Sequence, residues 1–314
     1  MGRVQGYKIF GDITGWDIDT YAMYRRDQGL ETITLNKELE TVKNFLEYCS
    51  RIELVDGDVP EKVDIPKVPH QKNVSEKLLS VKRANMLFRF YDQSEKQYST
   101  EHALLVIEWF NGSRLGGIRG LDIGSYTPSN KSEYEEGYLE YRHRPEIGLP
   151  LKNDYDGERI VGLPEYADNV VGSYVDENRK ESYDENGFRP LITTSTGRAS
   201  VGIIRAWTYL ATEPCLHTDC PHGNTRNKCK FANYSHGSKC PSSRSPHQVR
   251  TGSITWQLNK GVPLDRVSER VNTSQRILKK HYDHPSQLES FEERRRQYLS
   301  LLSFEEGEAE GDIL

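Results

Sequence analysis

Apolar residues recur at helical spacing near the start of the chain. Over Leu35–Tyr48 they return every three or four positions, so they share one face of a helix. Asp17–Gln28 indicates a shorter helix before it. Val55–Lys72 is instead rich in Pro, Asp and Lys, a composition typical of a linker. The pattern therefore predicts a small helical module over residues 1–65, followed by a second part over residues 66–314.

The second part alternates helical patterns with one β pattern. Tyr138–Val161 reads as short strands joined by turns, and Asp156-Gly157 is a typical hairpin turn. The expected helices begin near Leu78, with Ser75 as N-cap, and continue at His102–Asn111 with Thr100 as N-cap, Glu165–Asp176, Ser200–Ala211, Val249–Asn259, Leu264–Arg270, Gln275–His281 and Ser286–Leu302. The chain is therefore expected to be mainly α with a small β-sheet or hairpin.

Composition narrows the class of protein. The chain has 314 residues, of which 35% are apolar and 28% charged, enough to bury a core beneath a polar surface. Its longest apolar stretch, near Ala103–Phe110, is far shorter than the ~20 residues that span a bilayer. The N-terminus carries no basic-then-apolar signal pattern. We expect a cytoplasmic protein with no membrane association.

The net charge bears on possible partners. It is −5 with histidines neutral, whereas nucleic-acid-binding proteins are usually basic. Phe304–Leu314 adds an acidic tail with five carboxylates and no base, which is typical of a solvated chain end. Any nucleic-acid site must therefore be a local basic patch.

Four of the five cysteines fall in one short segment, residues 213–246, where they occur as Cys215-x4-Cys220-x8-Cys229-x10-Cys240. Four thiolates suffice for a structural zinc site. The spacing contains no Cys-x-x-Cys pair, so reduced free thiols, an iron–sulfur cluster or disulfides remain alternatives. The segment carries five basic and two acidic residues, and such a loop could touch DNA phosphates.

Phosphoryl transfer through a protein hydroxyl requires a nucleophile, cations on the phosphate oxygens, a proton donor for the leaving oxygen, and positioning. Candidates for these roles occur in the order Arg, Lys, His-x-x-Arg, Tyr. They are Arg114 in Asn111-Gly112-Ser113-Arg114, Lys152 in Leu149-Pro150-Leu151-Lys152, His247 and Arg250 in Pro246-His247-Gln248-Val249-Arg250, and Tyr282 in Lys280-His281-Tyr282-Asp283.

These boxes resemble those of the tyrosine recombinases, the phage integrase family. There, an arginine follows a small-residue turn, and the His-x-x-Arg box precedes a helix and a Gly-Val turn, here Gly261-Val262. The resemblance covers about Thr100–Tyr282. The amino-acid sequence of Thr251–Tyr282 most resembles that of integrase-like proteins of archaea and their mobile elements. It implies the tyrosine recombinase catalytic-domain fold, preceded by a small helical module that grips DNA.

The resemblance also implies a role for each candidate residue. Tyr282 attacks the scissile phosphate and forms a 3′-phosphotyrosine link. Arg114 and Arg250 neutralise the developing charge, with help from His247 and Asn272. His247 also handles the tyrosine proton. Lys152 protonates the departing 5′ oxygen, with Arg144 and Arg159 as rival donors. No cofactor is needed for this chemistry.

The sequence departs from the family pattern in three places. Gly117 stands where an acidic residue is usual, and Asn272 stands where a histidine or tryptophan is usual. An asparagine amide can donate a hydrogen bond to a phosphate but cannot exchange a proton as histidine does. The N-terminal module is also short, so its first helix is absent or the chain is a trimmed integrase.

The implied function is that of a site-specific DNA recombinase acting on double-stranded DNA, as a tetramer on two paired sites. Two alternatives share much of the pattern. One is an integrase-like protein of a mobile element that binds DNA without recombining it, and the other is a strand-cleaving enzyme similar to type IB topoisomerases. A zinc-containing interaction module unrelated to DNA chemistry is a third interpretation.

Overall fold

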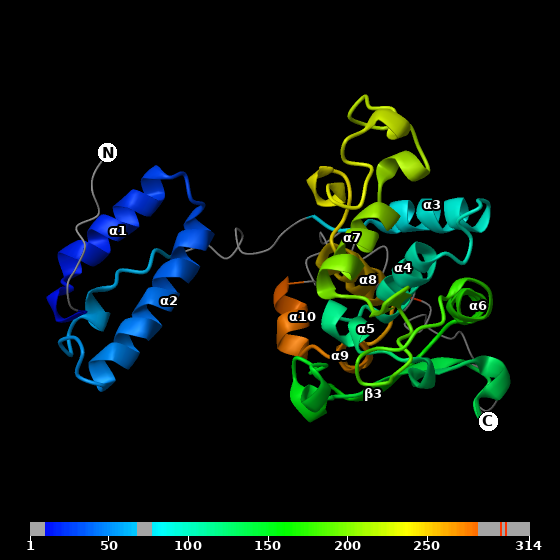
Figure 1. Cartoon of the computed structure of the whole chain (residues 1–314), viewed down its shortest axis with the longest axis horizontal. Helices are drawn as coiled ribbons and strands as arrows, with labels where there is room; N and C mark the ends of the chain where they lie inside the picture. The colour runs from blue at the N-terminus through cyan, green and yellow to red at the C-terminus, as the bar shows by residue number, and fades with distance from the viewer. Residues whose placement is uncertain (1–9, 68–76, 282–295, 297–298, 300–314) are drawn as a thin grey trace, which may run out of the picture. The chain divides into compact units, whose positions relative to one another are not determined.

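The structure, a computed structural model, describes residues 10–67 and 77–281 together with residues 296 and 299. It divides into two compact units, residues 1–76 and 77–314, and each is described here by itself (Figure 1). The sequence pattern placed this boundary at residue 65. Tyr282, the proposed cap Ser75 and the tail Phe304–Leu314 lie outside the described residues, as does the expected helix Ser286–Leu302 apart from residues 296 and 299.

The first unit is built on two helices, α1 (Gly15–Asp27) and α2 (Thr32–Arg51), with short 3-10 turns at Phe10–Asp12 and Pro60–Lys62. An ion pair of 2.7 Å between Arg25 and Glu38 joins the helices. The linker prediction for Val55–Lys72 was wrong in its first half. The core of this unit includes valines from that stretch, and its buried residues are Ile18, Ala22, Leu35, Leu39, Leu46, Cys49, Val55, Val59 and Val63.

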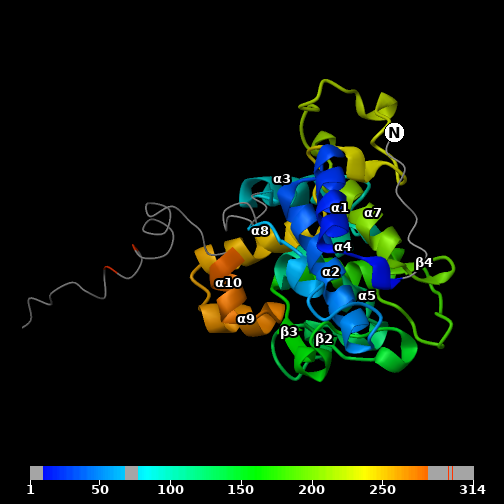
Figure 2. The same ribbon diagram turned by 90° about the vertical axis from the view of Figure 1, so that its left-hand side faces the viewer.

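The second unit is a helical body around one buried helix, α4. Its helices are α3 (Val81–Asp92), α4 (Thr100–Asn111), α5 (Leu115–Arg119), α6 (Glu165–Ser173, continued by a π turn to Asn178), α7 (Val201–Ala211), α8 (Pro246–Asn259), α9 (Leu264–Val271) and α10 (Gln275–His281). Residues 103–107 of α4 are fully buried, and α6, α7 and α8 pack around it. The last three helices, α8 to α10, pack against one another in chain order (Figure 2).

The β element is a three-stranded antiparallel sheet, in which β1 (Tyr126–Thr127) pairs with β2 (Tyr138–Tyr141) and β2 with β3 (Arg159–Gly162). A separate ribbon pairs β4 (Thr193–Thr194) with β5 (Gly197–Arg198). The predicted two-residue turn at Asp156-Gly157 was wrong. Those residues end a 3-10 helix, Asp154–Gly157, inside a long connection between β2 and β3. This connection carries Lys152.

Serine side chains begin the helices that matter for the site. Ser99, rather than the predicted Thr100, caps α4 by accepting the backbone N–H of His102. Ser245 caps α8 and forms a reciprocal capping box with Gln248. The capping box and Pro246 start α8 three residues before the predicted Val249, so His247 lies in its first turn.

None of the helices within residues 10–67 and 77–281 has both the length and the apolar composition needed to cross a membrane.

Candidate active site

Arg114 lies at the turn between α4 and α5, and that turn depends on Gly112. Gly112 adopts the left-handed conformation, with φ of 59°. A Cβ at this position would lie 2.9 Å from Cγ1 of Val271 and 3.0 Å from Oγ of Ser253. Both the backbone conformation and the close packing therefore require glycine. The turn places Arg114 at the N-cap of α5, beside the end of α9.

Arg114 and Arg250 meet at the segment that follows α9. Arg114 donates from Nη1 to the carbonyl of Asn272 at 2.6 Å and from Nη2 to the hydroxyl of Thr273 at 2.9 Å. Arg250 is 2% exposed, and it donates to the same hydroxyl and to the carbonyl of Gly112. Thr273 itself is buried. Three segments far apart in sequence thus hold two guanidinium groups together.

These two arginines line a cavity of about 450 Å³. Its lining residues are Ser113, Arg114, Leu115, Arg205, Tyr209, Ser245, Pro246, His247 and Arg250. The lining contains three arginines and one histidine and no carboxylate, although the chain as a whole is acidic. The first turn of α8 also faces this cavity, and a helix N-terminus carries partial positive charge. The cavity is therefore suited to an anion such as a phosphate group.

Lys152 is exposed and does not line this cavity. It lies in the connection between β2 and β3, and its neighbour Asn153 donates a hydrogen bond of 2.8 Å to the side-chain oxygen of Asn272. The connection that carries Lys152 therefore reaches the backbone segment that holds Arg114.

The two rival proton donors have structural partners. Arg144 forms an ion pair of 2.6 Å with Asp122, which also binds Arg198. Arg159 donates 3.0 Å to Oγ of Ser113 and 2.9 Å to the carbonyl of Arg270. Both guanidinium groups are committed to holding loops together. Neither lines the arginine-rich cavity.

Two of the three departures from the family pattern have local explanations. Asn272 ends α9 in the left-handed conformation, with φ of 49°, which asparagine tolerates better than most residues. Its carbonyl binds Arg114, so its backbone supports the site directly. A Cβ at Gly117 would lie 3.3 Å from the ring of Tyr141, whose hydroxyl accepts a hydrogen bond of 3.0 Å from Asn111. The aromatic ring thus leaves little room for an acidic side chain at position 117.

Sequence reasoning missed two residues of the cavity, Arg205 and Tyr209. They lie four positions apart on α7, so they share one face of that helix. Their spacing was the only available signal, and it is common in helices. The predicted nucleophile Tyr282 follows the last residue of α10 in the sequence and lies outside the described residues.

The four clustered cysteines line a second cavity, of about 150 Å³, together with His222. The segment that carries them projects from the helical body between α7 and α8 (Figure 1). Arg226 donates to Sγ of Cys215 at 3.4 Å, and burial, followed by the charge of Glu213, raises the pKa of the Cys215 thiol. All four cysteines are free, and among the described residues no three His, Cys, Asp or Glu side chains are placed to hold a metal ion. The fold therefore places the four thiols around one cavity, but it does not hold them in the geometry of metal ligands.

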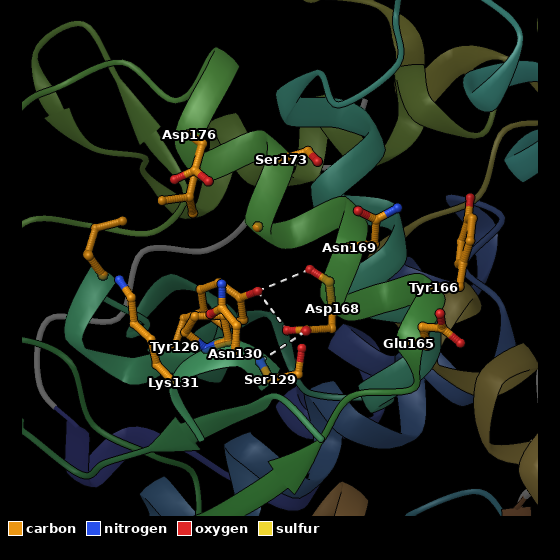
Figure 3. A pocket seen from close by; sticks show the side chains of 14 residues that line it. Tyr126, Ser129, Asn130, Lys131, Glu165, Tyr166, Asp168, Asn169, Ser173 and Asp176 are labelled. Carbon is orange, nitrogen blue, oxygen red and sulfur yellow. Dashed lines mark hydrogen bonds between the residues drawn. The ribbon is translucent and has the colours of Figure 1, made fainter. Parts of the chain in front are cut away.

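A larger cavity, of about 840 Å³, lies elsewhere, between α6 and the β1 region (Figure 3). Asp168 is buried there and accepts hydrogen bonds from the Tyr126 hydroxyl at 2.6 Å and from the Ser129 backbone at 3.1 Å. Glu165 and Asp176 also line it, against a single cation, Lys131. This negative lining disfavours a phosphate ligand.

Comparison with known proteins finds a similar sequence among the tyrosine recombinases. A protein of Caldanaerobacter subterraneus, named as a predicted tyrosine recombinase, is 21% identical to this chain over 163 residues. The match covers 52% of this chain and 49% of that protein, so the chain spans about half of its relative's length. No known family profile matches the chain.

Solved structures extend the likeness to nearly the whole chain. The Tn1549 transposon integrase, in complex with a circular intermediate DNA, has a TM-score of 0.62 at 13% identity, with 93% of this chain and 86% of that chain covered. XerH recombinase bound to its difH substrate has a TM-score of 0.58 at 14% identity, covering 96% and 73%. A lambda integrase dimer bound to a core site has a TM-score of 0.54 at 9% identity, covering 96% and 69%. The fold implied by the sequence boxes is confirmed: the chain has the tyrosine recombinase catalytic-domain fold, preceded by a small helical module.

Proposed function

We propose that this protein is a site-specific DNA recombinase that cuts and rejoins DNA through a 3′-phosphotyrosine intermediate. The observation that carries the proposal is the pairing of Arg114 and Arg250 on the hydroxyl of Thr273, at a cavity whose lining is cationic and free of carboxylates. The fold of recombinases solved with DNA supports the same function. The substrate is double-stranded DNA that carries a specific attachment-type site.

The mechanism follows from the charges at the cavity. Arg114 and Arg250 bind the non-bridging oxygens of the scissile phosphate and stabilise the charge that builds up in the transition state. Tyr282 attacks the phosphorus, and its proton passes to His247. The P–O bond to the 5′ oxygen breaks, and Lys152 donates a proton to that oxygen. The 5′ hydroxyl of a second strand later reverses the step, so the bond energy is conserved in the tyrosine ester.

Arg114 and Arg250 give this mechanism its structural basis because neither side chain has to be ordered when the phosphate binds. Their hydrogen bonds to Thr273, Gly112 and Asn272 fix both guanidinium groups before a phosphate binds. Preorganised cations cost no reorganisation during the reaction. Asn272 contributes its backbone carbonyl to this arrangement, and its side chain is held by Asn153.

Covalent trapping tests the function. The full chain is mixed with nicked duplexes taken from the DNA that flanks its gene, and the products are separated on a denaturing gel. We expect a protein–DNA band that disappears in Tyr282→Phe and persists in Tyr183→Phe, an exposed tyrosine 60% accessible. Tyr209→Phe is a necessary third variant because Tyr209 lines the cavity.

Each outcome of the trapping experiment separates two interpretations. An adduct that depends on Tyr209 and not on Tyr282 would assign the nucleophile to α7. DNA binding without any adduct would favour the non-recombining DNA-binding protein. An adduct accompanied by plasmid relaxation without sequence preference would favour the topoisomerase-like enzyme.

We propose further that the first unit also grips the DNA, and that four protomers assemble on two paired sites. The lambda integrase solved on a core site is a dimer, which supports the use of more than one protomer in that protein. Analytical ultracentrifugation with a duplex of one site and a duplex of two sites tests the assembly. We expect a tetramer only with two sites.

We propose that the four clustered cysteines hold a structural zinc ion. Their thiols line one small cavity, Arg226 donates to Sγ of Cys215, and thiolates at Cys215 and Cys240 would raise the pKa of Arg83. These arginines would offset the negative charge of a four-thiolate zinc site. Zinc binds cysteine as the thiolate, so binding displaces the thiol protons and zinc affinity falls as the pH is lowered.

The metal content of the protein tests this proposal. Elemental analysis of purified full-length protein should find one zinc per chain, lost in Cys229→Ser and kept in Cys49→Ala, whose cysteine is buried in the first unit. A zinc-free protein with an unchanged thermal midpoint and undiminished strand cleavage would argue for reduced thiols instead.

A further inference from the structure

Two residues of the arginine-rich cavity have no role in the mechanism above. Arg205 and Tyr209 lie one turn apart on α7 and line the same space as Arg114, His247 and Arg250. The opposite face of α7 is fixed in the core, since Ile204, Thr208 and Ala211 are buried. The two side chains therefore project from a firmly packed helix.

Arg205 differs from several other arginines of the second unit. Its side chain is exposed and makes no hydrogen bond or ion pair with any other described residue. Arg144, Arg198 and Arg189, by contrast, each pair with a carboxylate. An arginine placed among like charges, without a carboxylate in the lining, gains a partner only when an anion enters the cavity.

Tyr209 supplies a matching hydrogen-bond donor. It is half-buried, and Gly237 of the cysteine-rich segment packs against it, since a Cβ on Gly237 would lie 3.3 Å from Cβ of Tyr209. The α7 backbone at Tyr209 thus packs closely against that segment. Arginine forks and tyrosine hydroxyls are both common ligands of DNA phosphate oxygens.

The size of the cavity points to more than one phosphate. Arg114 and Arg250 are held beside Thr273, whereas Arg205 and Tyr209 project from α7. A volume of about 450 Å³ exceeds the space that a single phosphate group fills. DNA that places one phosphate on Arg114 and Arg250 must place the next phosphates of that strand close by.

We propose that Arg205 and Tyr209 form a second phosphate subsite, which binds a phosphate next to the scissile one on the same DNA strand. The subsite rests on the proposed function for the identity of its ligand. It anchors the strand on the α7 side of the cleavage point, so that the scissile phosphate is aligned on Arg114 and Arg250. Arg205 is a positioning residue in this scheme because it does not touch the reacting atoms.

A binding cycle tests the subsite. Duplexes from the DNA flanking the gene are made with one neutral methylphosphonate at a time, scanned along each strand, and bound by wild type and Arg205→Gln. We expect Arg205→Gln to weaken binding about 5-fold to 10-fold and to reduce the slope of log K against log salt by about 1. At one position per half-site, the neutral substitution should weaken wild type but leave Arg205→Gln unaffected.

Two further variants sharpen the result. Arg189→Gln, an exposed arginine paired with Glu181, should bind every duplex as wild type does. Tyr209→Phe should show the same position-specific loss of coupling as Arg205→Gln, to a smaller degree. Equal losses for wild type and Arg205→Gln at every scanned phosphate would overturn the subsite, as would an unchanged salt slope.

The readout separates the subsite from the proposed function. Position-specific coupling without any covalent adduct would keep the subsite and remove the strand-cleaving activity. An adduct with no coupling at Arg205 would keep the activity and remove the subsite. Failure of wild type to bind any duplex would overturn both.

Discussion

Arg114 and Arg250 donate hydrogen bonds to one acceptor, the hydroxyl oxygen of Thr273. The two arginines come from the α4–α5 turn and from α8, and the threonine follows α9. Like charges would normally separate, so the shared acceptor and the neighbouring carbonyls of Gly112 and Asn272 hold them together. An incoming phosphate therefore meets two cations already in place.

The shared acceptor predicts a large effect of a small change. Thr273→Val removes the hydroxyl with little change in volume, and we expect strand cleavage to slow by ~10–100-fold because the guanidinium groups lose their alignment. DNA binding should change little, since both charges remain. Thr273→Ser keeps the hydroxyl and should restore most of the rate. Single-turnover cleavage of a nicked duplex measures all three proteins, and a rate in Thr273→Val equal to that of wild type would contradict the role.

The two arginines should be far more sensitive than Arg205. Arg114→Gln and Arg250→Gln each remove a charged donor from the transition state, for which we expect a loss of ~10²–10³-fold in the cleavage rate. Arg205→Gln should act mainly on binding. Rates measured at saturating DNA separate the two classes. If Arg205→Gln lowered the saturated rate as much as Arg114→Gln, Arg205 would belong to the reacting centre.

The backbone of Asn272 yields a prediction about substitution. Asn272→Gly should keep the left-handed conformation and the carbonyl that binds Arg114, whereas Asn272→Ala should lose ~1 kcal/mol of folding stability through backbone strain. Urea unfolding curves at a fixed pH compare the three proteins. The order of stability is expected to be wild type, then Gly, then Ala. An alanine variant more stable than the glycine variant would show that side-chain contacts outweigh the backbone conformation.

Glu108 makes stability depend on pH. It is fully buried in α4. One carboxyl oxygen accepts a hydrogen bond of 2.7 Å from the Thr208 hydroxyl, and the other has no partner among the described residues. Burial raises its pKa to about 8. The unfolded chain releases this proton at its ordinary pKa, several pH units lower. The contribution of Glu108 to folding is therefore greatest in acid and declines as the pH rises toward 8, by at most ~1.4 kcal/mol per pH unit.

Glu108→Gln tests this dependence because the amide has the shape of the protonated carboxyl and does not titrate. We expect the free energy of unfolding of wild type to fall relative to that of the variant between pH 5 and pH 8, measured by urea denaturation. Parallel curves for the two proteins across that range would mean that Glu108 ionises in the folded state without penalty.

Local patterns in the sequence accounted for most helices and for the boxes around Arg114 and His247. They failed where the chain packs against distant residues. Val59 and Val63 lie in a stretch that is polar enough to resemble a linker, yet they complete the core of the first unit. The strand connection after Tyr141 is longer than its Asp156-Gly157 dipeptide suggested, because that dipeptide ends a 3-10 turn. Turn chemistry allows several conformations, and packing selects one.

The sequence by itself determined the helical periodicity, the order of the candidate residues and the glycine that the α4–α5 turn needs. Only the tertiary structure decided that Thr273 joins Arg114 to Arg250, and that Arg205 and Tyr209 face the same cavity. The physical reason is range: periodicity and capping act within a few residues, whereas Arg114 and Asn272 are 158 positions apart and meet only because α4, α8 and α9 pack together. The candidate site residues could be identified from the sequence, whereas the residues that they contact depended on the fold.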